Sequence, residues 1–243
     1  GVDLPATGGA AAEQVSVDAS VTIRGQTPAT SGNPAVIDGR VSLNADGAEL
    51  RSVVVTRSSP IDGPTIDAFA VRVKGSSTVV ADNVIRSVTG ESKPWGAING
   101  IQVFGQSPIQ NITIRSNTVR GLRNNLKDDS TVGGIAGIKL QADLTNVSVS
   151  GNTVTDLHSA GWAWGIVLTG SGSAPNYPKN VTVTKNRLSE LNDGTVQFGG
   201  SDPAFPGSSF GIDEGARADE ATLKYNNLLA PNGAESKDGS RTL

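Results

Sequence analysis

The chain has 243 residues, of which 20 are basic and 23 are acidic, giving a formal net charge of −3. This length suits one all-β domain, and the nearly balanced, dispersed charge excludes a basic stripe for nucleic acid. Cysteine and methionine are absent, so a disulfide framework and a thiolate metal site are excluded. No apolar run approaches the roughly 18 residues of a membrane-spanning helix. Because the chain begins at Gly1 without an initiator Met, we expect a processed, fragmentary or trimmed form.

Short alternating segments begin near the N-terminus, with VTIRG at Val21–Gly25 and RVSL at Arg40–Leu43. Further along, NITIRSNTV at Asn111–Val119 returns as NVSVSGNTV at Asn146–Val154 and as NVTVTKNRL at Asn180–Leu188. Apolar residues alternate with polar ones in each copy, which is typical of a strand with one buried face. A fixed period of this kind predicts a repeat architecture, in which each unit stacks on its neighbour.

Aligning the units on the second inward residue gives Leu50, Val80, Ile114, Val149, Val183 and Leu223, at intervals of 30, 34, 35, 34 and 40. A second strand motif lies between them at Ala70–Val73, Gly100–Val103, Gly137–Leu140, Gly165–Leu168 and Gly211–Glu214. Short strands that recur without tight reversals stack most simply in parallel, each on its equivalent one coil later. The sequence therefore predicts an all-β, single-stranded parallel β-helix of about seven coils, about 35 Å long.

These rungs, together with the opening segment EQVSVDASVTIRG that starts at Glu13, resemble the pectate-lyase-like right-handed parallel β-helix superfamily. The resemblance covers 13–229, which leaves 1–12 as a lead-in and 230–243 as a polar tail of a single domain 1–243. It implies a right-handed coil, as parallel crossovers generally prefer, and a secreted or cell-surface protein. The superfamily hosts lyases, hydrolases, epimerases and adhesins, so the resemblance does not choose among these functions.

Two columns of asparagine recur at fixed places in the aligned units. The first is Asn83, Asn117, Asn152, Asn186 and Asn226, and the second is Asn111, Asn146 and Asn180. Asn tolerates the left-handed backbone of a tight turn, and its amide can bond to the same amide one coil away. We therefore interpret the first column as a structural ladder. The second creates NIT, NVS and NVT triplets, for which the turn repeat is the simpler explanation and glycosylation the functional one.

The units differ most in four segments that we expect to be long loops on one side of the coil: Thr89–Asn99, Arg120–Ala136, Asp156–Gly165 and Ser189–Gly211. The three tryptophans of the chain, Trp95, Trp162 and Trp164, lie in these segments. Trp162 and Trp164 have the same parity on an extended segment and would face the same way. Two uses stay open for the tryptophans: packing of the loops onto the coil, or a flat platform for sugar rings.

Charged residues share these segments. Arg120, Arg123 and Lys127 can neutralise acidic sugars, whereas Asp128 and Asp129 can act as the carboxylates of a lyase or hydrolase. His158 is the only histidine, and it is either an incidental loop residue or a general base. The catalytic candidates are thus Arg123, Lys127, Asp128, Asp129 and His158, and the carbohydrate-binding candidates are Trp95, Trp162, Trp164, Arg120, Arg123 and Lys127. The signature motifs of the superfamily's enzymes are missing, so catalysis stays undecided.

Two segments, Asn44–Glu49 and Asp128–Thr131, carry hard oxygen ligands that suit Ca²⁺. Neither matches the EF-hand calcium loop, and a turn with solvated charges is the simpler interpretation. The sequence predicts no other cofactor and no metal-ligand cluster.

The leading hypothesis is an extracellular β-helix protein that binds an extended polysaccharide on its loop-bearing side. One alternative is a polysaccharide lyase or glycoside hydrolase that acts on an acidic glycan. Another is a non-catalytic module of a surface layer, adhesin or fibre, because neither end offers a clear cap and bare solenoid ends associate. The expected partners are a polysaccharide or surface glycan and further copies of the chain, and neither nucleic acid nor a membrane span is expected.

Overall fold

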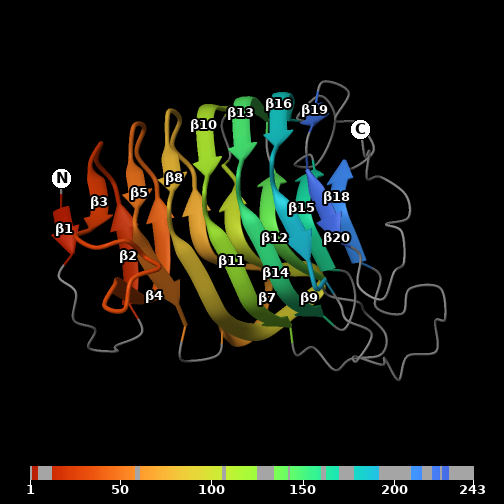
Figure 1. The fold of residues 1–243 in the computed structure, drawn as a ribbon, viewed down its shortest axis with the longest axis horizontal. Coiled ribbons are helices and arrows are strands. Elements are labelled where there is room, and N and C mark those ends of the chain that lie inside the picture. The colour runs from red at the N-terminus through yellow and green to blue at the C-terminus, as the bar shows by residue number, and fades with distance from the viewer. Residues whose placement is uncertain are drawn as a thin grey trace.

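The computed structural model describes residues 2–4, 13–57, 61–105, 108–124, 134–141, 143–159, 163–169, 178–191, 209–214, 221–224 and 226–229. Within these ranges the chain is all-β, without a helix, and no helix is long and apolar enough to cross a membrane. Side-chain placements are not described for 2–4, 13, 61–67, 91–96, 209–210, 213–214, 221 and 227–229. Figure 1 shows the strands stacked side by side from the N-terminal end to the C-terminal end.

The strands form two parallel sheets. The eight-stranded sheet contains, in spatial order, β1 (Val2–Leu4), β3 (Thr22–Gly25), β5 (Glu49–Arg51), β8 (Val79–Ala81), β10 (Ile109–Arg115), β13 (Leu144–Ser150), β16 (Lys179–Thr184) and β19 (Ala221–Lys224). The twelve-stranded sheet contains β2 (Glu13–Val17), β4 (Ala35–Leu43), β6 (Val53–Thr56), β7 (Ile61–Val73), β9 (Val84–Val103), β11 (Thr118–Asn124), β12 (Gly134–Gln141), β14 (Thr153–Ser159), β15 (Ala163–Thr169), β17 (Arg187–Ser189), β18 (Ser209–Glu214) and β20 (Asn227–Leu229).

Each coil pairs in register with the next. In the eight-stranded sheet the paired residues run Leu50, Val80, Ile114, Val149, Val183 and Leu223. In the other sheet the second motif pairs along Val71, Ile101, Ile138, Ile166 and Ile212. Both alignments predicted from the repeat are therefore confirmed, because each residue meets its equivalent one unit later. Within the segment expected to be a lead-in, Val2–Leu4 forms β1 and pairs with β3.

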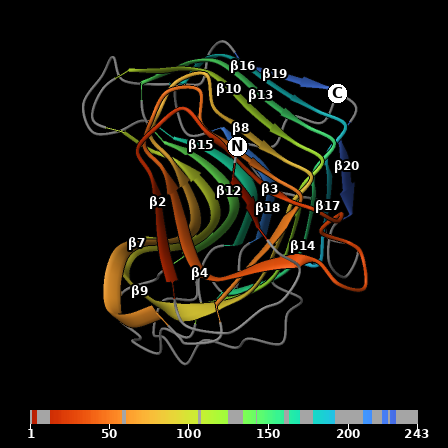
Figure 2. The same ribbon diagram turned by 90° about the vertical axis from the view of Figure 1, so that its left-hand side faces the viewer.

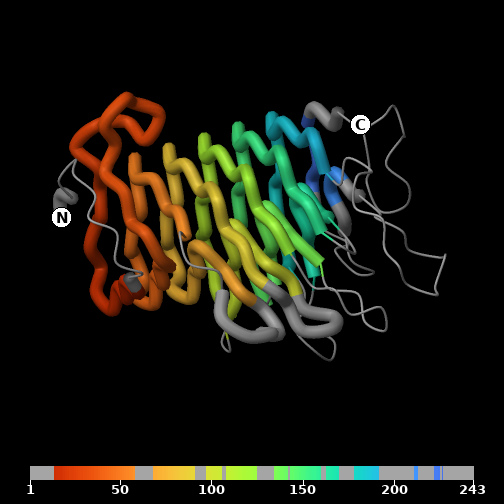
Figure 3. Tube along the Cα trace, turned by 90° about the horizontal axis from the view of Figure 1, so that it is seen from below, coloured from red at the N-terminus to blue at the C-terminus, as the bar shows by residue number. Residues whose placement is uncertain are grey.

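The sheets wrap around one interior as a nearly closed coil, which Figure 2 shows along the stack from the N-terminal end. Strand β9 is long enough to serve two faces of this coil. Its first part pairs with β6 and β11, and its last part pairs with β7 and β12. Figure 3 shows the same successive coils from below. Outward side chains of neighbouring coils are consequently brought into rows along the stack.

The interior is filled by the aliphatic residues of the alternating pattern. Ile85, Val119, Val154 and Leu188 are register partners on four successive strands, and each is no more than 1% exposed. Burying one such side chain contributes about 1.5–3 kcal/mol. The space between opposite faces is narrow, because a Cβ added to Gly137 would meet Cγ1 of Val154. This contact explains why the second motif begins with glycine in several units.

Asparagine amides connect the coils at the turn between the two sheets. Nδ2 of Asn83 donates to Oδ1 of Asn117 at 3.0 Å, and the same bond recurs from Asn117 to Asn152 at 3.0 Å. It continues from Asn152 to Asn186 at 2.9 Å and from Asn186 to Asn226 at 3.0 Å. In each case the backbone N of the donor residue also donates to the same oxygen. The first four asparagines are 1% exposed, so these bonds satisfy buried polar groups.

One of the four segments expected to be long loops is strand throughout. Thr89–Asn99 lies inside β9, which pairs with β7 through Gly90, Ser92 and Ala97. The prediction of a loop there is wrong, because the chain stays extended and its backbone groups bond to the coil before it. The other three expected loops begin or end in strands, and only 125–133, 160–162 and 192–208 of them lie outside the described residues. Arg120, Arg123, His158 and Trp164 are therefore on strands rather than in loops.

Candidate functional site

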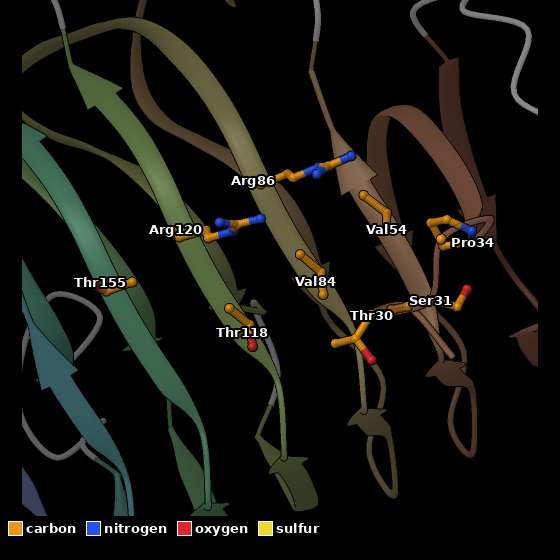
Figure 4. A pocket seen from close by; sticks show the side chains of 11 residues that line it. Thr30, Ser31, Pro34, Val54, Val84, Arg86, Thr118, Arg120 and Thr155 are labelled. Atoms are coloured by element: carbon orange, nitrogen blue, oxygen red, sulfur yellow. The ribbon is translucent and has the colours of Figure 1, made fainter. Parts of the chain in front are cut away.

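A groove of about 580 Å³ opens on the outer face of the twelve-stranded sheet, over β6 and the N-terminal ends of β9, β11 and β14. One wall comes from the β3–β4 connection, through Ala29, Thr30, Ser31, Gly32 and Pro34. The floor is formed by Val54, Val84, Arg86, Thr118, Arg120 and Thr155, which belong to β6, β9, β11 and β14 (Figure 4). The groove thus crosses four successive strands of the stack.

Strand register explains why these floor residues share one face. Arg86 pairs with Arg120, and Arg120 pairs with Thr155, so the three form one outward row. Val84 pairs with Val54 and Thr118, which form a second outward row two residues earlier in each strand. The residue between the rows on each strand points inward, since side chains alternate along a strand.

One end of the groove is apolar. Val54 is 1% exposed and Val84 is 7% exposed, although both face outward, because Ala29 of the β3–β4 connection covers them. The connection is held by two local hydrogen bonds. Oγ1 of Thr27 donates to the carbonyl of Asn33 at 2.8 Å, and the backbone N of Ser31 donates to the carbonyl of Pro28 at 2.9 Å. The sequence around this turn therefore builds a wall rather than a freely projecting loop.

The other end of the groove is cationic. Arg86 and Arg120 are both exposed, and neither forms an ion pair or side-chain hydrogen bond within the described part of the chain. Figure 4 shows both side chains reaching along the stack toward β6, with the guanidinium of Arg120 directed at the strand that carries Arg86. Like charges on directly opposite strand positions are destabilising. Close by, Oγ of Ser31 is buried and lacks a hydrogen-bond partner among the described residues.

A charged cluster lies beyond a bend in the same strands. Gly121 and Asp156 adopt left-handed backbone angles, with φ of 66° and 58°, and turn β11 and β14 at the same place. After the bend, Nη2 of Arg123 donates to Oδ1 of Asp156 at 2.6 Å, and Nη1 donates to the Asp156 carbonyl at 2.8 Å. Nε2 of His158 lies 3.0 Å from the same Oδ1. One carboxylate is thus shared by an arginine and the only histidine.

The structure brings together only some of the residues predicted for carbohydrate binding and catalysis. Arg120 lines the groove, whereas Arg123 and His158 lie past the bend with Asp156. Trp164 is half-buried, and its ring lies against Gly134 of the neighbouring strand β12. Trp162, Lys127, Asp128 and Asp129 lie outside the described residues, and the side chain of Trp95 is not described. The hypotheses that involve those five side chains stay predictions.

The second asparagine column lies at exposed bends inside β10, β13 and β16 rather than on turns between strands. Asn111, Asn146 and Asn180 have φ between 49° and 60°, the left-handed backbone that asparagine tolerates. Nδ2 of Asn146 donates to Oδ1 of Asn111 at 3.1 Å, and Nδ2 of Asn180 donates to Oδ1 of Asn146 at 2.6 Å. The amide nitrogens of two of the three triplets are therefore engaged by a neighbouring coil.

The first candidate calcium segment is engaged by protein groups. Oδ1 of Asp46 accepts the backbone N of Ser76 at 2.6 Å, and Oε2 of Glu49 accepts Nε of Arg51 at 2.7 Å. Nδ2 of Asn44 donates to Asp18 at 2.7 Å. No group of three or more His, Cys, Asp or Glu residues is placed to hold a metal ion within the described ranges. The second candidate segment, Asp128–Thr131, lies outside them.

The sequence hypotheses missed Arg86 and the β3–β4 wall. Arg86 follows Asn83 by three residues, as Arg120 follows Asn117 and Thr155 follows Asn152. The constant spacing of three residues from each ladder asparagine therefore indicates that Arg86, Arg120 and Thr155 occupy equivalent positions. The wall carried no comparable signal, because QTPATSGNP at 26–34 occurs once and its position over Val54 and Val84 depends on the folded coil.

Comparisons with known proteins add little to this geometry. No protein-family model matches the chain, and no curated protein matches it. Among solved structures, the Azotobacter vinelandii mannuronan C-5 epimerase AlgE6 A-module is similar at 14% identity, over 90% of this chain and 89% of that chain, with a TM-score of 0.14. A likeness of this degree carries no argument about fold or function.

Proposed function

We propose that the protein binds an extended polysaccharide across its lateral surface, with the groove beside the β3–β4 connection as the principal binding site. The observation that carries this proposal is the composition of the groove, whose floor is built from side chains of four successive strands. Successive strands are about 4.8 Å apart, so a long ligand that lies along the stack contacts one outward side chain of each row on every strand it crosses.

The side chains of the groove suit a sugar chain. Pro34 is half-buried and offers apolar surface to the C–H face of a ring, while Thr118 and Thr155 offer hydroxyls that can donate and accept. Binding sites for small ligands generally combine an apolar lining with a few polar groups that fix orientation. We further propose that the protein is extracellular and that the coil is a right-handed parallel β-helix of about seven turns, which the general preference of parallel crossovers supports.

Blocking the groove tests the proposal. A Cβ added to Gly32 meets nothing within 4 Å, and Gly32 lines the groove. Gly32→Trp should therefore fill the groove without disturbing packing, and Gly32→Ala is its matched control. In calorimetric titration against a panel of neutral and acidic polysaccharides, we expect Gly32→Trp to weaken binding at least about tenfold, a loss of roughly 1.4 kcal/mol, and Gly32→Ala to bind as the parent does. Equal binding by all three proteins, at equal melting temperature, would exclude the groove.

A second candidate function is cleavage of an acidic polysaccharide. It is favoured by the shared carboxylate of Asp156, which fixes Arg123 and His158 together beyond the bend. A general base needs an imidazole or carboxylate held in position, and an arginine can neutralise a uronate. The test is the formation of unsaturated or reducing ends from polyuronates, with Asp156→Asn and His158→Ala as variants. If neither product appears from any polymer that binds, the protein is a binding module and not an enzyme.

A further inference from the structure

Arg86 and Arg120 are unusual among the strand arginines of this protein. Most others have a partner: Arg51 bonds Glu49 at 2.7 Å, Arg115 lies 3.7 Å from Asp82, and Arg123 bonds Asp156 at 2.6 Å. A second pair of arginines, Arg24 and Arg51, also occupies neighbouring strands. There, however, the carboxylate of Glu49 lies beside the pair.

No carboxylate is bonded to Arg86 or Arg120 among the described residues. The neighbours of the pair in its outward row are Thr56 on one side and Thr155 on the other. The carboxylate of Asp156, next to Thr155 in the chain, is already bound by Arg123 and His158. The row reaches a carboxylate, Asp38, only one strand beyond Thr56. Two adjacent cations without a bonded counter-charge raise the free energy of the fold, and an anion placed between them would lower it.

We propose that Arg86 and Arg120 form an oxyanion subsite, which takes the carboxylate or sulfate of an acidic sugar residue lying in the groove. The guanidinium group is a planar fork that matches both oxyanions through paired hydrogen bonds. Pro34 on the wall of the groove and the hydroxyl of Thr118 would meet the ring of the same sugar residue. The ligand class is therefore a polyanionic glycan rather than a neutral one, and this inference rests on the proposed function.

The subsite predicts which polymers bind and how salt affects them. Because the two guanidinium groups are exposed, their attraction for an anion is screened as ionic strength rises. An acidic polymer should consequently bind more tightly than its neutral parent at low salt, and this advantage should shrink at high salt. Binding that depends only on the apolar and hydroxyl groups would lack this dependence.

The experiment uses dextran, carboxymethyl dextran and dextran sulfate, which share one backbone and differ in their charged groups. Each is titrated into the full chain and into Arg86→Gln, Arg120→Gln and the double variant, with Arg24→Gln as a control that loses the same charge on the other sheet. We expect each groove variant to weaken binding of a charged polymer about tenfold or more, as loss of a charge-assisted hydrogen bond does. Arg24→Gln should have no such effect.

The outcomes separate the two proposals. A preference for carboxymethyl dextran or for dextran sulfate identifies which oxyanion the subsite takes. Charged dextrans that bind no better than dextran, or an equal loss in Arg24→Gln, would overturn the subsite while leaving groove binding by a neutral glycan intact. If no polymer binds the parent protein, neutral members of the wider panel included, both proposals fail.

Discussion

The indole ring of Trp164 lies over Gly134 of the neighbouring strand. A Cβ built on Gly134 would meet Cζ3 of the ring and would be 2.9 Å from its Cη2 atom. Trp164 is also half-buried, so at least one face of its ring is used for packing against the coil. Packing against the coil therefore uses one side of this ring, and the sugar platform at Trp164 stays a prediction.

This contact predicts that Gly134→Ala destabilises the protein. The added methyl group must displace the indole, and overpacking of this kind typically costs about 1–3 kcal/mol. Chemical denaturation followed by tryptophan fluorescence measures both the loss of stability and the altered environment of the ring. Gly32→Ala is the control, because its Cβ meets nothing. Equal stability of the two variants would show that Trp164 does not depend on contact with Gly134.

Much of the coil could be predicted from the sequence, whereas the groove could not. The strand register follows from local spacing, as in Ile114, Val149 and Val183, because a buried face repeats whenever the same pattern repeats. The groove depends on a segment that occurs once, at 26–34, and on how it folds back over Val54 and Val84. Such a contact between segments far apart in the sequence leaves no periodic signal.

The expected loops failed for a related physical reason. Thr89–Asn99 contains Gly, Pro and charged residues that favour a loop locally. In the folded protein the neighbouring strand β7 supplies backbone partners along this segment, so it remains extended within β9. Tertiary pairing overrides local preference here. The row of Arg86 and Arg120 was predictable in principle, because the asparagine spacing sets the register, although only Arg120 was singled out.

Asn152 should be among the least replaceable polar residues. Its Oδ1 accepts the backbone N and Nδ2 of Asn117, and its Nδ2 donates to Asn186 and to the carbonyl of Ile114. Asn152→Ala would leave several buried groups without partners, at about 1–3 kcal/mol for each unsatisfied group. We expect a total loss of about 2–5 kcal/mol in the free energy of unfolding, measured by urea denaturation.

The exposed asparagine column supplies the matched control for Asn152. Asn146→Gly removes an amide that bonds its neighbours in the same way, yet it lies on the surface, and glycine accepts its φ of 58°. Its cost should be less than about 1 kcal/mol, because water replaces the lost bonds. If Asn152→Ala were no more costly than Asn146→Gly, burial would not be what makes the first column important.

Glu49 should make stability dependent on pH on the acid side. The hydrogen bond from Arg51, aided by one from Thr22, holds the pKa of the Glu49 carboxyl below its ordinary value despite partial burial. Since the folded pKa is lowered, the stabilisation is complete above the ordinary glutamate pKa of about 4.3. It is lost as the pH falls through the lower, folded value.

Thermal melts of Glu49→Gln across this acid range check that expectation. At neutral pH the variant should be less stable by no more than about 1 kcal/mol, because the pair is partly exposed. The difference in melting temperature between Glu49→Gln and the parent protein should vanish at the acid end of the range. Asp82→Asn, which removes a longer and more exposed pair with Arg115, should have a smaller effect at neutral pH. A difference that stays constant with pH would rule out titration of Glu49 as the cause.

The bend that separates the groove from the Asp156 cluster predicts opposite effects of two substitutions at equivalent positions. Gly121 and Glu190 both have positive φ, 66° and 53°. Gly121 lies at the bend inside β11, and Glu190 directly follows β17. A Cβ on Gly121 would be 3.4 Å from its nearest atom, so Gly121→Ala introduces backbone strain without a clash. The left-handed conformation should cost the alanine variant about 1–2 kcal/mol of stability. Glu190→Gly relieves the same strain, and it should raise stability by about 0.5 kcal/mol once the greater entropy of glycine in the unfolded chain is subtracted. Denaturant unfolding of both variants measures the two signs, and a loss of stability in Glu190→Gly would mean that its side chain, rather than its backbone angle, sets the preference at the bend.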